Sequence, residues 1–426
     1  MKFLYNNISL KEKDIQDYIE SIKILSQKME KGIVSESYID PNGFLHLPED
    51  KDALKEIKEL KERLVSSNLK YVLVVGIGGS SMGAMGIYEA LFGYGDIYEL
   101  NRFPKIIFVE TCDSEIFSKL ETLIASISHP SEILVSIVTK SGKTTETIIN
   151  TNLIIGLLKR FKDFSDRIVC ITNRNSEVWN IAKKNKFSLL EIPEMVGGRY
   201  SIFSPAGLFP LACIGVDISA LCEGAISIHK MISSDTILEN YPAISAIALY
   251  LSMKGDKKIH NTFIFHPEFE NIGKWYKQLM AESTGKNENI GMVPTVSIGS
   301  QDLHSIAQLY LGGPDDIVTT FIYTEKRNIL HKISPDDFSK IIGDFESKSL
   351  VDVMSAIYEG TKNGYKKANR QFMEIILPDI SEHSLGAFLE FKMIEIVYLA
   401  GLMKVDAFNQ PDVEKYKEEV RKIMNY

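Results

Sequence analysis

The amino-acid sequence predicts an α/β protein with two doubly wound parallel sheets, a helical N-terminal lead-in and C-terminal helices. Three observations support this fold class. Apolar, largely β-branched runs alternate with helical stretches, the alternation occurs in two separate blocks, and turns rich in glycine or hydroxyl groups follow two of the runs. Such alternation produces parallel strands whose helical crossovers cover both faces of a sheet.

Residues 1–69 are charged and have a helical pattern with an apolar stripe, so they form a lead-in and not a separate domain. The first α/β domain, 70–215, contains five predicted strands at 71–75, 105–110, 133–138, 168–172 and 188–192.

The second α/β domain, 216–400, repeats this architecture after the helical stretches 204–232 and 241–253. Its four strands are predicted at 260–265, 292–298, 317–323 and 372–377, and the helices between them at 269–282, 301–311 and 351–367. A helical stretch at 385–403 and the segment 401–426, with a helix from Pro411 to the C-terminus, close the chain.

The turn at 139–147 is the first candidate site. It follows a strand, opens a helix, and holds the hydroxyls of Thr139, Ser141 and Thr144 beside the lysines Lys140 and Lys143. Hydroxyls, cations and free helix amides bind anions, most simply the phosphate of a monoester. The turn alone also fits a hydroxyl-rich helix cap with solvated lysines. A nucleotide P-loop is excluded, because its spacing requires glycine at position 137, which is isoleucine.

A glycine-rich turn, Gly76-Ile-Gly-Gly-Ser80, ends the first strand of the first block. A dinucleotide fingerprint needs glycine or alanine where Ser81 stands, which disfavours a nicotinamide-dependent dehydrogenase. The two turns can face one ligand if their strands are neighbours in the sheet.

The composition of the chain excludes some classes of binding partner and indicates a cellular compartment. The 426 residues carry a net charge of −8, which argues against nucleic acid or a membrane surface as partner. No signal sequence is evident at the N-terminus, and charges interrupt the apolar stretch 385–403. Four cysteines without a CxxC pair are typical of buried thiols in a reducing cytoplasm: Cys112, Cys170, Cys213 and Cys222.

Five motifs resemble those of the glucose-6-phosphate isomerase family. Gly197-Gly-Arg-Tyr-Ser201 resembles its Gly-Gly-Arg-Tyr/Phe-Ser signature, and Phe408-Asn-Gln-Pro-Asp-Val-Glu-Lys-Tyr-Lys417 resembles its C-terminal motif. The other three, in order along the chain, are Gly-Ile-Gly-Gly-Ser at 76–80, Glu-Ser-Thr-Gly-Lys at 282–286 and the segment 301–308.

This resemblance implies two sugar-isomerase-type, flavodoxin-like domains in a homodimer that interconverts glucose 6-phosphate and fructose 6-phosphate in glycolysis and gluconeogenesis, without metal or cofactor. It further implies that Arg199 lies over the enediolate, Glu282 moves the proton, and Lys417 and a His304 shared across subunits open the sugar ring. The implied substrate-binding residues are Gly79, Ser80, Thr139, Lys140, Ser141, Thr144, Gln278 and Gln410. Lys143 and Asp412 depart from the family pattern.

The chemistry of these residues is compatible with those roles. Glu282 lies at the end of a predicted helix, where a carboxylate opposes the helix dipole, and Gln278 is one turn earlier on the same face. Arg199 follows two glycines that let its guanidinium approach a ligand. Taken singly, each of these residues also fits a structural or solvated side chain, as do His304 and Lys417.

A sugar-phosphate-binding regulator is the rival function. It would keep the turn at 139–147 and lose the proton-transfer groups. The presence of Glu282, Arg199 and His304 favours the enzyme.

Overall fold

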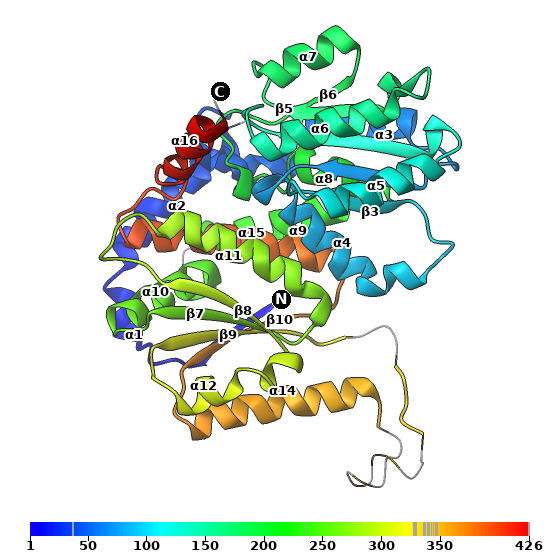
Figure 1. Ribbon diagram of the computed structural model, residues 1–426. Coiled ribbons are helices and arrows are strands. Elements are labelled where there is room, and N and C mark those ends of the chain that lie inside the picture. Colours follow the sequence, from blue (N-terminus) through cyan, green and yellow to red (C-terminus); the bar gives the residue numbers. More distant parts are fainter. Residues whose placement is uncertain are drawn as a thin grey trace.

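The computed structural model describes residues 1–35, 38–234, 236–326, 330–334 and 348–424, with the single residues 338, 341, 343 and 345. This part of the chain forms two five-stranded sheets with helices between and outside them (Figure 1). The predicted class of two doubly wound α/β units is therefore confirmed.

The first sheet has five parallel strands in the order β3-β2-β4-β5-β6. They fall on the five predicted runs: β2 (Tyr71–Val75), β3 (Lys105–Val109), β4 (Ile133–Thr139), β5 (Ile168–Thr172) and β6 (Ser188–Glu191). Every residue of β4 is buried, as expected for a central strand covered on both faces. The chain changes direction across the sheet between β2 and β4, which makes their junction the topological switch point.

Helices cover both faces of the first sheet. Alternate residues of β2 divide between two cores: Val72 and Val74 face a core shared with the second sheet, and Leu73 and Val75 face an outer core. The inner helices are α3 (Lys51–Leu64), α4 (Met82–Phe92) and α8 (Pro205–Cys213), and the outer ones are α5 (Ser114–Ser126), α6 (Thr145–Leu158) and α7 (Glu177–Asn185).

The second sheet has the order β1-β10-β9-β7-β8. Its four parallel strands match the prediction: β7 (Ile259–Ile264), β8 (Val293–Ile298), β9 (Ile317–Thr324) and β10 (Phe372–Leu377). The fifth strand, β1 (Lys2–Asn7), pairs antiparallel with β10 and places Phe3 opposite Ile375. The lead-in is helical later in its length, but the sequence pattern does not predict this first strand.

Two layers of helices enclose the second sheet (Figure 1). Between the sheets lie α9 (Ile218–Ile232), α10 (Tyr241–Lys254), α11 (Glu270–Thr284) and α15 (Glu382–Leu402), and on the outer face lie α12 (Ala307–Gly312) and α14 (Leu350–Lys367). The predicted helix at 301–311 is wrong in detail. A 3-10 turn, η9 (Gln301–Leu303), precedes α12, and His304 lies between them.

The lead-in continues with α1 (Glu12–Gln16), α2 (Ile19–Val34) and the 3-10 helix η1 (Pro41–Glu49). The remaining 3-10 turns are η2 (Gly78–Ser80), η3 (Tyr94–Tyr98), η4 (Pro130–Glu132), η5 (Phe164–Arg167), η6 (Gly198–Tyr200), η7 (Ile237–Glu239) and η8 (Pro267–Phe269).

The central helix α15 is buried on every side, which matches its apolar composition all round. Two of the charges that interrupt it pair with each other, since Lys392 lies 2.7 Å from the carboxylate of Glu395. Within the described residues, no helix combines the length and apolarity needed to cross a membrane.

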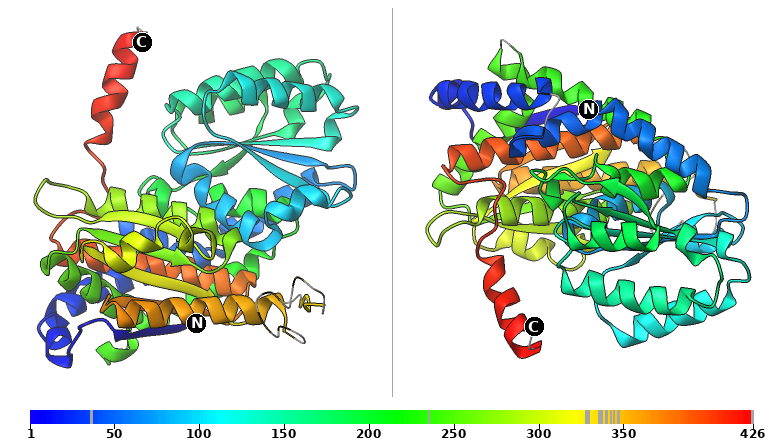
Figure 2. Two further views of the ribbon diagram at one scale, coloured as in Figure 1. Left: turned by 60° about the horizontal axis from the view of Figure 1, so that its bottom comes forward. Right: turned by 90° about the horizontal axis from the view of Figure 1, so that it is seen from above.

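The last helix, α16 (Val413–Met424), stands out from the body of the protein, and none of its residues is buried (Figure 2). It confirms the helix predicted from Pro411, although residues 425–426 lie outside the described part of the chain.

Three of the four cysteines, Cys170, Cys213 and Cys222, are buried free thiols, as predicted. Burial raises the pKa of Cys170 and of Cys222 to about 12. The expectation is wrong for Cys112, which is exposed because β3 ends before it, at Val109.

Candidate active site

Two turns meet at the switch point of the first sheet. β2 leads into η2, β4 leads into the turn at 139–147, and the two strands are hydrogen-bonded neighbours. A Cβ added to Gly76 would lie 2.9 Å from the carbonyl oxygen of Val138, so the strand ends are in close contact. Both turns therefore lie at the carboxyl ends of adjacent strands, where doubly wound sheets bind ligands.

A contact between two glycines joins the first turn to the loop that carries Arg199. A Cβ on Gly79 would lie 2.3 Å from the carbonyl carbon of Gly198 and 2.5 Å from the amide nitrogen of Arg199. This separation admits only glycine. The hydroxyl of Ser201 also donates to the carbonyl oxygen of Gly79 at 3.4 Å. The predicted binding residue Gly79 thus lies directly beside the predicted catalytic Arg199.

Two hydroxyls of the turn at 139–147, those of Thr139 and Thr144, are not committed to other described residues. Thr139 is buried, and its hydroxyl has no hydrogen-bond partner among the described residues. Ser141 accepts a hydrogen bond from the amide of Lys143 at 3.3 Å. Thr144 is the N-cap residue of α6, but its side chain makes no capping hydrogen bond. Hydroxyls that a helix N-terminus does not use itself are available to an anion.

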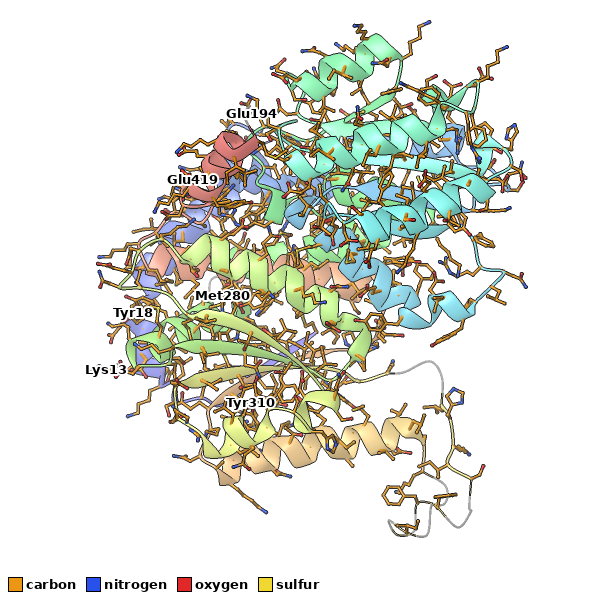
Figure 3. The ribbon with its side chains drawn as sticks, in the orientation of Figure 1. Lys13, Tyr18, Glu194, Met280, Tyr310 and Glu419 are labelled. Atoms are coloured by element: carbon orange, nitrogen blue, oxygen red, sulfur yellow. The ribbon has the colours of Figure 1, made fainter. Side chains whose placement is uncertain are left out.

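Lys140 brings positive charge to the same place. Burial lowers the pKa of its ammonium, and the charges of Glu194 and Arg199 act on that pKa with opposite signs, so Lys140 lies near both. Figure 3 labels Glu194 in the loop that follows β6. The turn at 139–147 therefore lies within electrostatic range of Arg199.

Arg199 and Glu282 form the centre of the site. Arg199 is 2 % exposed, and its Nη1 donates to the Glu282 carboxylate at 3.2 Å. Its Nε donates to the hydroxyl of Ser283 at 2.9 Å, and the Tyr200 hydroxyl lies 3.0 Å from the same oxygen. An arginine held by this many contacts is a cation fixed in position.

Glu282 lies in the last turn of α11, as predicted, and 29 % of its side chain is exposed. Its other carboxylate oxygen accepts a hydrogen bond from the amide nitrogen of Gln278 at 3.0 Å. Gln278 in turn lies against the glycine-rich turn, since a Cβ on Gly78 would be 3.0 Å from its Nε2. Glu282 is thus oriented by two donors while it remains accessible from solvent.

The 407–410 segment completes this cluster from the C-terminal end of the chain. Gln410 accepts a hydrogen bond from Arg199 Nη1 at 2.7 Å, so the structure brings Gln410 together with Arg199. Arg199 Nη2 donates to the carbonyl oxygens of Ala407 at 2.6 Å and Asn409 at 3.1 Å. The ring of Phe408 packs 5.2 Å from that of Tyr200 and so holds the segment in place.

A known protein family resembles this chain in sequence. The profile of the family described as phosphoglucose isomerase matches residues 34–426. The chain belongs to the phosphoglucose isomerase family. A curated relative, glucose-6-phosphate isomerase from Methanocaldococcus jannaschii, is 31 % identical over 411 residues, which are 96 % of this chain and 94 % of the relative.

Solved structures resemble the fold as well. A hypothetical protein from Thermus thermophilus has a TM-score of 0.87 at 23 % identity and covers 99 % of both chains. A glucose-6-phosphate isomerase from Chlamydia trachomatis has a TM-score of 0.82 at 16 % identity, covering 99 % of this chain and 88 % of the other. At these identities the likeness establishes the fold alone.

Two residues to which the phosphoglucose isomerase resemblance gives roles stand apart from the cluster in this chain. His304 is exposed, and among the described residues no hydrogen bond or ion pair joins its side chain to Arg199 or Glu282. Lys417 lies on the projecting α16, where its ammonium pairs with Glu414 at 2.8 Å. The structure therefore assembles Arg199, Glu282, Gln278 and Gln410, but not the two groups expected to open the ring.

Some residues of the cluster have no role in the sequence-based prediction. Ser283 and the carbonyls of Ala407 and Asn409 hold Arg199, and Lys286 donates to the carbonyl oxygen of Glu282 at 2.5 Å. Ser283 and Lys286 belong to the motif at 282–286, so the family resemblance already pointed to them.

Proposed function

We propose that the protein interconverts glucose 6-phosphate and fructose 6-phosphate at the cluster around Glu282 by proton transfer through an enediolate. The main support for this function is the pairing of a solvent-accessible carboxylate, Glu282, with a fixed cation, Arg199. The uncommitted hydroxyls of Thr139 and Thr144 in the turn at 139–147 add a place for an anion. Aldose-ketose isomerisation needs a base that reaches C1 and C2 and a charge that stabilises the enediolate oxygens.

The phosphate is proposed to bind at the switch point of the first sheet. Ser80, Thr139, Ser141 and Thr144 would supply hydroxyls, with Lys140 and the amide of Gly79 beside them. Hydrogen bonds to a charged phosphate are stronger than those to neutral groups, and the N-terminus of α6 adds a favourable dipole. This placement directs the sugar carbons toward Arg199 and Glu282, because Gly79 and Gly198 are in contact.

Glu282 is proposed to remove the proton from C2 of the aldose and return it to C1. Gln278 and Arg199 orient its two oxygens. Arg199, fixed by Ser283, stabilises the negative charge that develops on the enediolate without taking up the proton.

Ring opening is proposed to use Lys417 and the partner subunit's copy of residue 304 in a homodimer. α11 crosses from the carboxyl end of β7 to the amino end of β8, so Glu282 lies toward the amino ends of the second sheet. His304 follows the carboxyl end of β8, and six strand residues span about 20 Å.

Figure 3 places Met280 of α11 and Tyr310 of α12 on opposite faces of the second sheet. His304 lies three residues before the first residue of α12 and is thus remote from Glu282 within one chain, which supports its use in the site of a second subunit.

A coupled assay tests the activity. Purified protein receives fructose 6-phosphate in the presence of EDTA, and glucose 6-phosphate is detected with its dehydrogenase. A Glu282→Gln preparation made in parallel reports any isomerase carried over from the expression host. Glucose 6-phosphate formation that is equal in both preparations, or missing from the wild type, would contradict the proposed function.

Subunit exchange tests the homodimer. Inactive His304→Ala and Glu282→Gln proteins are mixed, because one site of each heterodimer then holds both wild-type groups. Recovery of activity is expected in this mixture and in neither variant mixed with itself. If heterodimers are demonstrated and no activity returns, the shared site is wrong.

We also propose a cytoplasmic location, supported by the three buried free thiols and by the metabolic setting of the reaction. Fractionation of the native cell with an antibody to this chain would place it with cytoplasmic markers. Enrichment in the membrane or secreted fraction would contradict the proposal.

A further inference from the structure

Two cations hold the 407–410 segment at the base of α16. Arg199 donates to the carbonyl oxygen of Asn409, and the ammonium of Lys286 donates to the same carbonyl. Lys286 also donates to the carbonyl oxygen of Glu282 at the end of α11. One lysine therefore ties the helix of the proposed catalytic base to the segment from which α16 begins.

Lys286 differs from the solvated lysines of the surface. Its side chain is partly buried, and burial, followed by the positive charge of Arg199, lowers the pKa of its ammonium. Two cations that share one carbonyl oxygen repel each other. Such an arrangement is unfavourable for stability by itself, and departures of this kind are concentrated at functional sites.

The position of the 407–410 segment determines where Lys417 can reach. Asn409 precedes Val413, the first residue of α16, by four residues, and Lys417 follows Val413 by four more. Four helical residues advance about 6 Å along the axis. Within the described chain α16 has no buried residue, so its few attachments to the body include the contacts of this segment.

We propose that Lys286 is a positioning residue that acts through Lys417. Its two hydrogen bonds fix the base of α16 on the C-terminal end of α11, and this sets the separation between the ammonium of Lys417 and the carboxylate of Glu282. The inference rests on the proposed isomerase function, in which Lys417 takes part in ring opening and Glu282 in proton transfer.

The experiment compares kcat and KM of Lys286→Met, which keeps the apolar stem and loses the donor, with those of Lys286→Arg, which keeps both. Lys277→Met is the matched control, because this lysine lies on α11, nine residues before Lys286, with an exposed side chain. We expect Lys286→Met to lower kcat about 10–100-fold with KM and phosphate-analogue affinity nearly unchanged, as for a misplaced reacting group. The kcat of Lys286→Arg should be close to that of the wild type, and the kcat of Lys277→Met should equal it.

A double variant tests whether the effect passes through Lys417. If it does, the double variant Lys286→Met with Lys417→Ala should have nearly the same kcat as Lys417→Ala alone. Losses that multiply, wild-type kcat in Lys286→Met, or no recovery in Lys286→Arg would each overturn the proposal. If Lys286→Met does not fold, as judged by thermal unfolding, Lys286→Gln replaces it under the same criteria.

These outcomes are distinct from failure of the isomerase function. Wild-type protein without isomerase activity would refute the function itself. Full activity in Lys417→Ala would remove the residue through which Lys286 is proposed to act. If kcat falls in Lys417→Ala and stays at the wild-type value in Lys286→Met, only the inference about Lys286 is overturned.

Discussion

Two turns of this protein have similar composition and different contacts. The turn at 139–147 follows β4 and opens α6, and the turn at 379–384 follows β10 and opens α15. Both lie at the carboxyl end of a buried parallel strand and contain several hydroxyl residues. The two turns thus share their position between a strand and a helix and their hydroxyl residues. They differ in the hydrogen bonds that these hydroxyls make.

In the turn at 379–384 an internal carboxylate accepts the hydroxyls. Asp379 accepts hydrogen bonds from Ser384 at 2.6 Å and from Ser381 at 2.7 Å, and Ser381 caps α15 through the amide of Ser384. The turn at 139–147 has Lys140 and Lys143 beside its hydroxyls, and the hydroxyls of Thr139 and Thr144 are uncommitted among the described residues. The charge of the neighbouring residues thus decides whether a hydroxyl-rich turn serves the fold or a ligand.

The largest expected effect tests the ligand turn directly. Ser141→Ala combined with Thr144→Ala removes two hydrogen bonds to a charged phosphate and should weaken substrate binding by about 3–6 kcal/mol if the two add. KM and the inhibition constant of a sugar-phosphate analogue measure the effect. Values within twofold of wild type for both would mean that this turn is not the phosphate site.

A second variant separates phosphate binding from chemistry. Glu282→Gln keeps the side-chain shape and loses the base, so kcat should fall by about 10²–10⁴ with little change in analogue affinity. Wild-type enzyme in heavy water should incorporate deuterium at C1 of fructose 6-phosphate at less than one atom per turnover. Near-normal kcat in the variant, or product free of deuterium after many reversals, would remove Glu282 from its assigned role.

A smaller effect is expected at the capping turn. Ser381→Ala removes the N-cap of α15 and should lower the free energy of unfolding by about 1 kcal/mol without changing KM. Denaturant unfolding and steady-state kinetics provide the two measurements. A raised KM with an unchanged free energy of unfolding would mean that the turn at 379–384 binds substrate and does not stabilise the fold.

The smallest expected effect is a pH dependence at Asp379. Hydrogen bonds from Ser384, followed by those from Ser381, lower the pKa of its carboxyl group. Its contribution to stability is therefore present above the unfolded pKa of about 3.9 and is lost as pH falls through the lower folded pKa. Unfolding of wild type and Asp379→Asn should differ at neutral pH and converge in acid. A difference that persists unchanged into acid would contradict this linkage.

The sequence was informative where strands are buried on both faces. β4 and β5 are continuous apolar runs, and their ends were predictable to within one residue. β1 was not, because its strand conformation depends on pairing with β10 at the other end of the chain and not on a local pattern. The turn geometry around His304 was missed for a related reason, since an amphipathic pattern does not distinguish an α-helix from a 3-10 turn followed by a short helix.

Motifs contain the residues that meet around Arg199, but they do not predict the contacts between them. The neighbours of Arg199, from Ser283 to Gln410, are distant in sequence and meet only in the folded chain. The position of Lys417 outside the cluster and the attachment of Lys286 to Asn409 likewise depend on tertiary structure.

The pairing of β1 with β10 constrains how the protein is made. The ribosome synthesises β1 long before its partner β10, because more than 360 residues separate the two strands. The strands of the first sheet are contiguous along the chain and can associate early, whereas pairings between such distant segments are slow to form. Until then β1 is an unpaired strand that can associate with other chains. The nascent protein therefore has its proposed phosphate-binding turn long before the 407–410 segment arrives to complete the proposed active site.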